Sequence, residues 1–173
     1  MKLFMAVVLV WGIVCVGLVI KIAGFGINFT ESMPKGVYLE HEAAAKRGDV
    51  VTFCLRDDEY IALAEEREYL SAGSCPSGLR PLLKYLAGVP GDVITIEQDA
   101  IICGPQNGIR CRWSGKIRQT DSADRPLQSQ LQSCVIPPNM ALVLSLHPGS
   151  FDSRYFGLVN VGSLTHVKHI PFN

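Results

Sequence analysis

Hydrophobic positions divide the chain into an apolar N-terminal run and a body of short alternating segments. The run Leu3–Ile20 contains no charged side chain, and Lys2 and Lys21 bracket it. As a helix it would extend about 27 Å, enough to cross the hydrocarbon core of a bilayer. We therefore predict a transmembrane anchor within residues 1–23 and one folded domain over residues 24–173.

A cleaved signal peptide is the alternative interpretation of the same apolar run. Such a peptide ends in small residues at the −3 and −1 positions of its cleavage site. The stretch Ala23-Gly24-Phe25-Gly26 meets that requirement only in part, so we favour a retained anchor. Lys2 beside the free N-terminus favours a cytoplasmic start, which places the domain outside the cytoplasm.

The body of the chain has the pattern of a β-rich domain. Helical periodicity occurs only in Glu59–Leu70, whereas Gly24–Phe29 is expected to be a linker and Ser114–Gln132 an exposed loop. Short apolar segments rich in β-branched residues predict strands. The expected strands are Val37–Leu39, Asp49–Leu55, Val93–Ile96, Ala100–Cys103, Ile109–Trp113, Ala141–Leu146, Leu158–Val161 and Leu164–Ile170. We therefore predict a mainly β fold with one or two short helices.

Composition narrows the possible partners. Lys plus Arg and Asp plus Glu both number 16, so the formal net charge is zero. A balanced charge gives no support for binding nucleic acid or another polyanion. No phosphate loop, nucleotide motif or metal-ligand spacing occurs, and we expect no cofactor and no metal.

Five cysteines follow the apolar run: Cys54, Cys75, Cys103, Cys111 and Cys134. Their spacing matches no zinc site. In an oxidising compartment two disulfides and one free thiol are expected. Cys54 with Cys75 and Cys103 with Cys111 are candidate pairs, and the sequence leaves the pairing open.

Ser32 lies at the start of a short stretch that cannot continue a helix. Pro34 fixes its own φ and pushes Met33 toward an extended conformation, and Gly36 then permits a turn. Ser32 is therefore expected on an exposed, rigid connection close to the anchor. Taken alone, this stretch is also consistent with a plain structural turn.

Lys84 is the one charged residue in the apolar run Pro81–Val89. Such a lysine reaches water, pairs with a carboxylate, or becomes neutral through desolvation. Serine needs a base to become a nucleophile, and a lysine can supply it when burial lowers its pKa. No histidine shows a defensible Ser/His/Asp order, so Ser32 and Lys84 form the candidate pair.

Three motifs in order resemble the type I signal peptidase family of membrane-anchored Ser/Lys proteases. They are Ser32-Met33-Pro34, the lysine box Lys84-Tyr85-Leu86-Ala87-Gly88-Val89-Pro90-Gly91-Asp92, and Ser150-Phe151-Asp152-Ser153-Arg154-Tyr155-Phe156-Gly157. The resemblance implies the β-sheet body of a signal peptidase behind an N-terminal transmembrane helix.

The same resemblance assigns roles to individual residues. Ser32 would be the nucleophile and Lys84 the general base. The oxyanion would be bound by the backbone N–H of Ser32 and by the hydroxyl of Thr30, two positions earlier.

The third motif would supply the remaining members of the site. Ser150 would hydrogen-bond the lysine amine, and Asp152, counted among the catalytic residues, would form an ion pair with Arg154. Ser153 would be a further supporting residue. A simple surface pair is the alternative interpretation of Asp152 and Arg154.

Departures from the general family pattern point to one of its branches. Leu146-His147-Pro148-Gly149 replaces the usual Gly-Asp-Asn opening of the last motif, and Tyr85 replaces an arginine. With the short, cysteine-containing body, these features most resemble the conjugative-transfer propilin peptidases, the TraF-like branch.

That branch implies cleavage of a conjugative pilin precursor near its C-terminus and its cyclisation through an acyl-enzyme. The implied partners are the precursor, the membrane and components of the conjugative (type IV secretion) apparatus. The implied location is the inner membrane, single-pass, with the domain in the periplasm. A general signal peptidase and a non-catalytic anchored scaffold are the alternatives.

Overall fold

The structure is a computed structural model that describes residues 4, 5, 9, 11 and 25–172. Within these residues no helix has the length and apolar character needed to cross a membrane. The predicted anchor falls almost entirely outside the described residues and stays a prediction.

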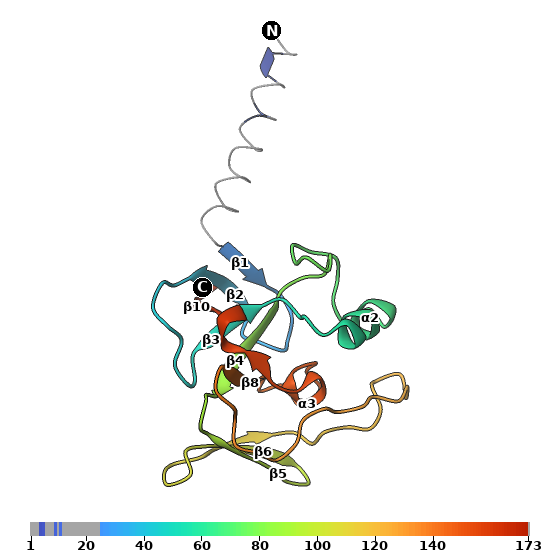
Figure 1. Cartoon of the computed structure of the whole chain (residues 1–173). Coiled ribbons are helices and arrows are strands. Elements are labelled where there is room, and N and C mark those ends of the chain that lie inside the picture. Colours follow the sequence, from blue (N-terminus) through green and yellow to red (C-terminus); the bar gives the residue numbers. More distant parts are fainter. Residues whose placement is uncertain (1–3, 6–8, 10, 12–24, 173) are drawn as a thin grey trace.

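Two antiparallel sheets form the body of the molecule (Figure 1). The larger has the order β1-β2-β10-β3-β4-β8-β9, and the smaller has the order β5-β6-β7. The strands are β1 Phe25–Asn28, β2 Gly36–Glu40, β3 Val50–Phe53, β4 Leu82–Gly88, β5 Val93–Ile96, β6 Ala100–Gly104, β7 Cys111–Ser114, β8 Met140–Leu144, β9 Val159–Asn160 and β10 Thr165–Pro171. Strands β1 and β2 lie at one end of the molecule, and β5 and β6 at the other (Figure 1). The mainly β prediction is confirmed.

Strand β1 corrects the prediction of a linker over Gly24–Phe29. It pairs antiparallel with β2, from Phe25 opposite Leu39 to Asn28 opposite Gly36. The two glycines in this segment hid the alternating pattern of a strand. Gly36 in turn has no room for a side chain, because a Cβ there would lie 2.5 Å from the Ile170 carbonyl oxygen on β10.

The helices are short. Helix α2 spans Asp58–Glu66, and the Asp57 carboxylate caps its N-terminus by accepting from Glu59 N and Tyr60 N. The helix predicted over Glu59–Leu70 therefore exists but ends early. Glu68 has a φ of 56°, which is incompatible with a right-handed helix. Helix α3 spans Ser153–Phe156, and a 3-10 turn, η1, spans Val161–Ser163.

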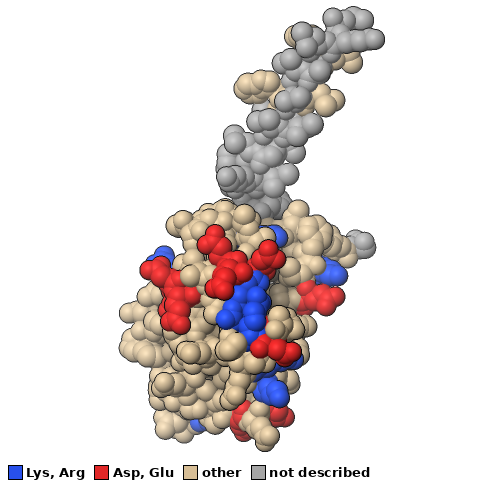
Figure 2. Space-filling model, turned by 90° about the vertical axis from the view of Figure 1, so that its right-hand side faces the viewer, with Lys and Arg blue, Asp and Glu red and all other residues tan. Residues whose placement is uncertain are grey.

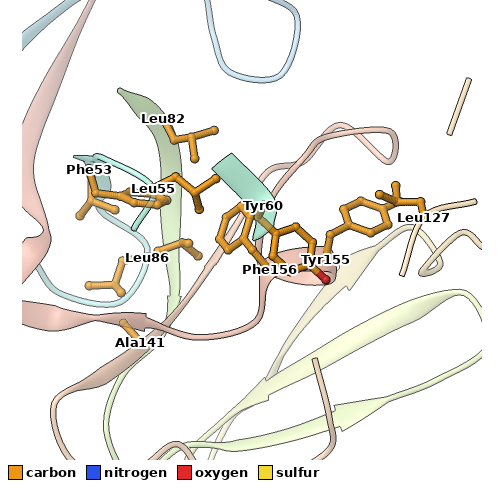
Figure 3. Close-up of a cluster of buried hydrophobic side chains, with 11 residues drawn as sticks. Phe53, Leu55, Tyr60, Leu82, Leu86, Leu127, Ala141, Tyr155 and Phe156 are labelled. Atoms are coloured by element: carbon orange, nitrogen blue, oxygen red, sulfur yellow. The ribbon is translucent and has the colours of Figure 1, made fainter. Parts of the chain in front are cut away.

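The larger hydrophobic core lies where β3, β4 and β8 meet α2 and α3 (Figure 3). Its fully buried members include Val51 and Val143 at 0% exposure. A second core under the small sheet contains Ile94, Ile101 and Leu144. The prediction that Ser114–Gln132 is merely an exposed loop is wrong in part, because its leucines enter these cores. Leu127 joins the first core and Leu131 the second.

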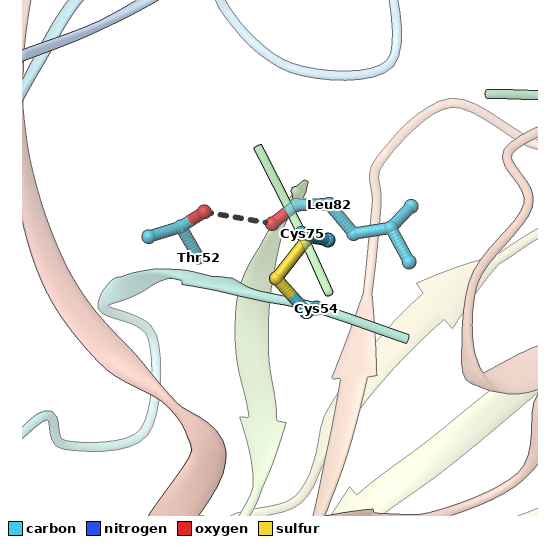
Figure 4. The surroundings of a disulfide bond; sticks show 4 residues. All are labelled: Thr52, Cys54, Cys75 and Leu82. Carbon is cyan, nitrogen blue, oxygen red and sulfur yellow. Dashed lines mark hydrogen bonds between the residues drawn. A yellow bond between two sulfur atoms is a disulfide. The ribbon is translucent and has the colours of Figure 1, made fainter. Parts of the chain in front are cut away.

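One disulfide closes the segment that carries α2. Cys54, directly after β3, is bonded to Cys75, 21 residues later, with their Cα atoms 5.6 Å apart (Figure 4). Cys103 and Cys111 are direct cross-strand partners between β6 and β7 but remain thiols, as does Cys134. Of the two candidate pairs, the structure forms only Cys54–Cys75.

Candidate functional site

A cavity of about 920 Å³ lies between the β1–β2 connection and the first half of β4. Thr30 and Ser32 line it from that connection, and Lys84 lines it from β4. Ser150 reaches it from the loop between β8 and α3. The tertiary structure thus places four of the predicted site residues around one cavity, although they are separated by up to 120 positions in the sequence.

Lys84 points into the protein because of its place in the strand. The burial pattern of β4 alternates, and Lys84 shares its buried face with Leu82 and Leu86. The residue is only 3% exposed. Desolvation by this burial lowers the pKa of Lys84 to about 8, with the Arg154 charge acting in the same direction and that of Asp152 opposing it. A substantial fraction of this amine is therefore neutral near physiological pH.

Ser32 lies in the bend that connects β1 with β2 and is partly exposed. Met33 anchors this bend in the protein and is 3% exposed. The Ser32 carbonyl oxygen accepts a hydrogen bond from Ser145 Oγ, directly after β8. Thr30 Oγ1 lies 3.0 Å from Ser32 Oγ. The hydroxyl predicted as second oxyanion donor therefore lies beside the predicted nucleophile.

Asp152 and Arg154 form a buried ion pair rather than a surface pair. Both side chains are 0% exposed, and Arg154 Nη1 lies 2.7 Å from Asp152 Oδ2. The same carboxylate accepts from Ser145 N at 3.0 Å, and Arg154 Nη2 donates to the carbonyl oxygens of Ser145 and Ser114. Burial raises the pKa of Asp152, whereas the charges of Arg154 and Lys84 act to lower it. The predicted pair is present, and it fixes the backbone of Ser145.

Two serines of the third motif differ in their contacts. Ser153 Oγ accepts the backbone N–H of Val143 at 3.0 Å, so it supports the end of β8. Ser150 is 4% exposed, and its hydroxyl has no hydrogen-bond partner among the described residues. The predicted hydrogen bond from Ser150 to Lys84 is therefore absent from this structure, although both residues line the cavity.

The lysine box divides into a cavity residue and a structural turn. Lys84 lines the cavity, whereas Asp92, at the end of the box, is buried away from it. Its carboxylate accepts from Val89 N at 2.9 Å and pairs with Arg47 at 2.5 Å. The second half of the box therefore stabilises the turn between β4 and β5.

Comparison with known proteins shows the family to which the chain belongs. The family model described as "Signal peptidase, peptidase S26" matches residues 1–172. The chain belongs to the S26 signal peptidase family. It is therefore a member of a serine peptidase family.

Individual relatives refine the comparison. A plasmid transfer protein TraF of Escherichia coli is 31% identical over 147 residues, which cover 84% of this chain and 80% of that protein. A conjugal transfer protein TraF of Agrobacterium tumefaciens (strain 15955) is 32% identical over 153 residues, covering 86% and 82%. The crystal structure of a signal peptidase I from Enterococcus faecalis V583 is 23% identical with a TM-score of 0.40, covering 72% of this chain and 96% of that one.

The S26 motifs did not reveal three residues that shape the site. Asn28, at the end of β1, contacts the bend through its side chain, and Ser145 holds the Ser32 carbonyl. Tyr38, a predicted strand residue, donates to the Pro34 carbonyl oxygen at 2.6 Å. Asparagine side chains often hydrogen-bond the backbone two residues further on, as in an Asx-turn, and this tendency could have marked Asn28.

The outer wall of the cavity is held by a network around Asp121. Its carboxylate accepts from the Tyr69 hydroxyl at 2.5 Å and from Arg125 Nε at 2.8 Å. The Tyr69 hydrogen bond and the bonds from Arg125 and Ala123 hold the pKa of Asp121 well below its usual range. This network joins the segment after α2 to the loop 115–130. The face of the molecule seen in Figure 2 carries acidic and basic side chains close together.

No group of three His, Cys, Asp or Glu side chains is arranged to hold a metal ion in the part of the chain that the structure describes.

Proposed function

We propose that this chain is a Ser/Lys peptidase in which Ser32 is the nucleophile and Lys84 the general base. The observation that carries the proposal is one cavity lined by both side chains, with the pKa of the buried Lys84 lowered to about 8. Ser32 remains partly exposed, so a substrate carbonyl can reach it. A neutral amine and an accessible hydroxyl are the two groups that this chemistry requires.

In the proposed reaction the neutral Lys84 amine takes the proton of Ser32 as Oγ attacks the substrate carbonyl carbon. The negative charge that develops on the carbonyl oxygen is met by the Ser32 backbone N–H and the Thr30 hydroxyl. Lys84 then returns the proton to the departing amine, and an acyl-enzyme on Ser32 remains. An incoming amine or a water molecule attacks this ester and restores the serine.

Two unpaired strand edges support a peptide as the substrate. Among the strands that the structure describes, β1 is at the edge of its sheet and pairs only with β2. Residues Leu82–Lys84 of β4 pair with β3, whereas pairing with β8 begins at Tyr85. Both edges lack a second strand partner among the described residues, which suits an extended peptide bound by strand addition. Residues 26–28 and 81–84 from these two edges line the cavity.

We further propose that the substrate is a conjugative pilin precursor. The support comes from the relatives named plasmid or conjugal transfer protein TraF, which the chain matches over most of their length. Cleavage near the precursor's C-terminus followed by attack of its own N-terminal amine would give a cyclic pilin. Components of the conjugative apparatus are the partners that this role requires.

The proposed location is the inner membrane, with residues 1–23 as a single anchor and the domain in the periplasm. The charge-free run Leu3–Ile20 supports the anchor. The disulfide between Cys54 and Cys75 supports an oxidising compartment for the domain.

Mass spectrometry of the pilin precursor, expressed with and without this chain, tests the proposal. A trimmed linear product indicates hydrolysis, and a product lighter by one water indicates cyclisation. Ser32→Ala and Lys84→Ala should each reduce processing by at least about 10³-fold, as losses in serine peptidase sites do. Full processing by either variant would contradict the Ser/Lys assignment and favour the non-catalytic scaffold.

The general signal peptidase uses the same chemistry on a different substrate. The family description itself favours this alternative. It predicts that the chain restores secretory processing in cells depleted of their own signal peptidase, while the pilin precursor stays uncut.

A further inference from the structure

The side chain of Asn28 holds the bend that carries Thr30 and Ser32. Its amide nitrogen Nδ2 donates to the carbonyl oxygens of Thr30 at 3.1 Å, Met33 at 2.9 Å and Pro34 at 3.2 Å. Its oxygen Oδ1 accepts from Thr30 N at 3.2 Å and from the Thr30 hydroxyl at 2.7 Å. One side chain thus contacts both ends of the bend.

The partners determine which atom of the Asn28 amide is the oxygen. The Thr30 backbone N–H can only donate, and the three carbonyl oxygens can only accept. Turning the amide over would place its NH₂ group against that N–H and its oxygen against three other oxygens. The orientation of Asn28 is therefore fixed by chemistry.

This orientation assigns the hydroxyl protons of Thr30 and Ser32. A threonine hydroxyl has one proton, and Thr30 donates it to Asn28 Oδ1, which has none to give. In the 3.0 Å contact between Thr30 Oγ1 and Ser32 Oγ, the donor must then be Ser32. In the free protein Ser32 therefore points its proton at Thr30, and the Thr30 proton is not available to an oxyanion.

We propose that Asn28 is a positioning residue that holds the Thr30 hydroxyl beside Ser32, where it accepts from Ser32 until a substrate arrives. When charge develops on the substrate carbonyl, the Thr30 hydroxyl turns about its C–O bond and donates to that oxygen instead. The Ser32 proton passes to Lys84 in the same step, so no proton is gained or lost. Asn28 Oδ1 keeps its bond from Thr30 N throughout, and the bend stays in place.

This inference rests on the proposed function, because it assigns a role within the same reaction. The competing explanation is that Asn28 only closes the bend and has no link to the hydroxyl of Thr30. The two explanations differ in how the loss of Asn28 combines with the loss of that hydroxyl. If Asn28 acts through the hydroxyl, removing both costs no more than removing the hydroxyl alone.

The test is a double-mutant cycle with Asn28→Ala and Thr30→Val. The reaction measured in each variant is the acetylation of Ser32 by p-nitrophenyl acetate. This small acyl donor needs no peptide-binding subsites. The release of p-nitrophenolate is followed at increasing concentrations of p-nitrophenyl acetate. It gives the acylation rate at saturation and the ester concentration that half-saturates the protein. Mass spectrometry of the peptide containing Ser32 locates the acetyl group, and Ser32→Ala gives the background.

Thr30→Val should lower the acylation rate at saturation by about 10²–10³-fold, the usual loss for one oxyanion donor. Asn28→Ala should lower it by about tenfold or more, with less than about threefold change in the half-saturating concentration. The double variant should match Thr30→Val within about threefold. Losses that multiply in the double variant, or an Asn28→Ala rate equal to wild type, would overturn the inference.

Tyr38→Phe is the matched control, because it removes a different bond to the same bend. In the wild type the Tyr38 hydroxyl donates to the Pro34 carbonyl oxygen, and among the described residues it forms no hydrogen bond with Thr30. Any loss caused by Tyr38→Phe should therefore multiply with that of Thr30→Val. If the losses from Tyr38→Phe and Thr30→Val fail to multiply, just as we expect for Asn28→Ala with Thr30→Val, the non-additivity is a property of the whole bend. The inference is then wrong.

The proposed function and the inference fail in different ways. Wild-type protein that takes no acetyl group on Ser32 contradicts Ser32 as a nucleophile, and with it the proposed function. The other outcome is that the wild-type protein is acetylated on Ser32 but the losses from the Asn28 and Thr30 substitutions multiply. That outcome leaves the proposed function intact and contradicts only the role given to Asn28.

Discussion

The two sides of the candidate site are built by opposite means. On one side, Lys84, Asp152 and Arg154 are at most 3% exposed and lie within the core of the sheet. On the other, Thr30 is exposed and Ser32 is partly exposed on a bend beside the edge strand β1. The buried side is fixed by packing and an ion pair, whereas the bend is held by side-chain hydrogen bonds from Asn28, Tyr38 and Ser145.

This difference follows from what each side has to do. A lysine becomes a base near neutral pH only if water is removed from it, which requires the core. A nucleophile must be reached by a peptide, which requires a surface. Ser145 links the two sides, because its N–H donates to Asp152 and its hydroxyl donates to the Ser32 carbonyl. Disturbing the buried side is therefore expected to change stability more than disturbing the bend.

The largest effect on stability is expected from Arg154→Met. It leaves the Asp152 carboxylate buried without its partner, which should lower the free energy of unfolding by about 3–5 kcal/mol. Urea unfolding of the variant and the wild type measures this loss in free energy of unfolding. The matched control is Arg112→Met, which removes a half-exposed arginine paired with Glu97 and Asp99 and should cost no more than about 1 kcal/mol. Equal losses in the two variants would contradict the buried pair as the anchor of this side.

A second expectation is that Lys84→Met abolishes activity yet stabilises the fold at pH 7. Lowering the pKa from 10.5 to about 8 amounts to about 3 kcal/mol against the protonated lysine. Between these values the unfolded chain binds the proton and the folded chain does not, so wild-type stability should rise with pH over that window. The advantage of the methionine variant should shrink over the same window. A variant less stable than wild type at pH 7 would argue against a desolvated lysine.

The two buried serines of the third motif should respond differently to alanine. Ser153→Ala leaves the Val143 N–H without its acceptor and should cost about 1–3 kcal/mol. Ser150→Ala removes a hydroxyl that has no partner among the described residues and should change stability by less than about 1 kcal/mol. Thermal unfolding of both variants measures these two changes in stability. A reversed order would mean that Ser150, rather than Ser153, supports this loop.

A last expectation concerns the pH dependence of processing by the wild-type protein. If neutral Lys84 is the base, the rate should rise about tenfold per pH unit below its pKa of about 8 and level off above it. Processing of the precursor measured from mildly acid to alkaline pH reports this profile. A flat profile would show that another group accepts the proton.

Much of the fold was readable from local pattern. Strand β5 coincides with the predicted Val93–Ile96, whereas the predicted strand Ala141–Leu146 is realised as β8 only up to Leu144, and Leu146 is exposed. Strand β1 was missed because two glycines within the six residues Gly24–Phe29 give a weak strand signal. The buried leucines Leu127 and Leu131 were missed because they are isolated within a polar segment, where periodicity has nothing to measure.

The sequence by itself determined the family motifs, the balanced charge and the apolar surroundings of Lys84. These are properties of neighbouring residues. The sequence left open whether Lys84 reaches water, pairs or is buried, and the place of β4 between β3 and β8 buried it. Only the tertiary structure decided that the Asp152–Arg154 pair is buried, that Ser150 lacks a bond to Lys84, and that Asn28 Oδ1 accepts from the Thr30 hydroxyl. Each of these depends on which polar atoms meet in space, because burial and hydrogen-bond partners are set by packing between distant segments and not by sequence order.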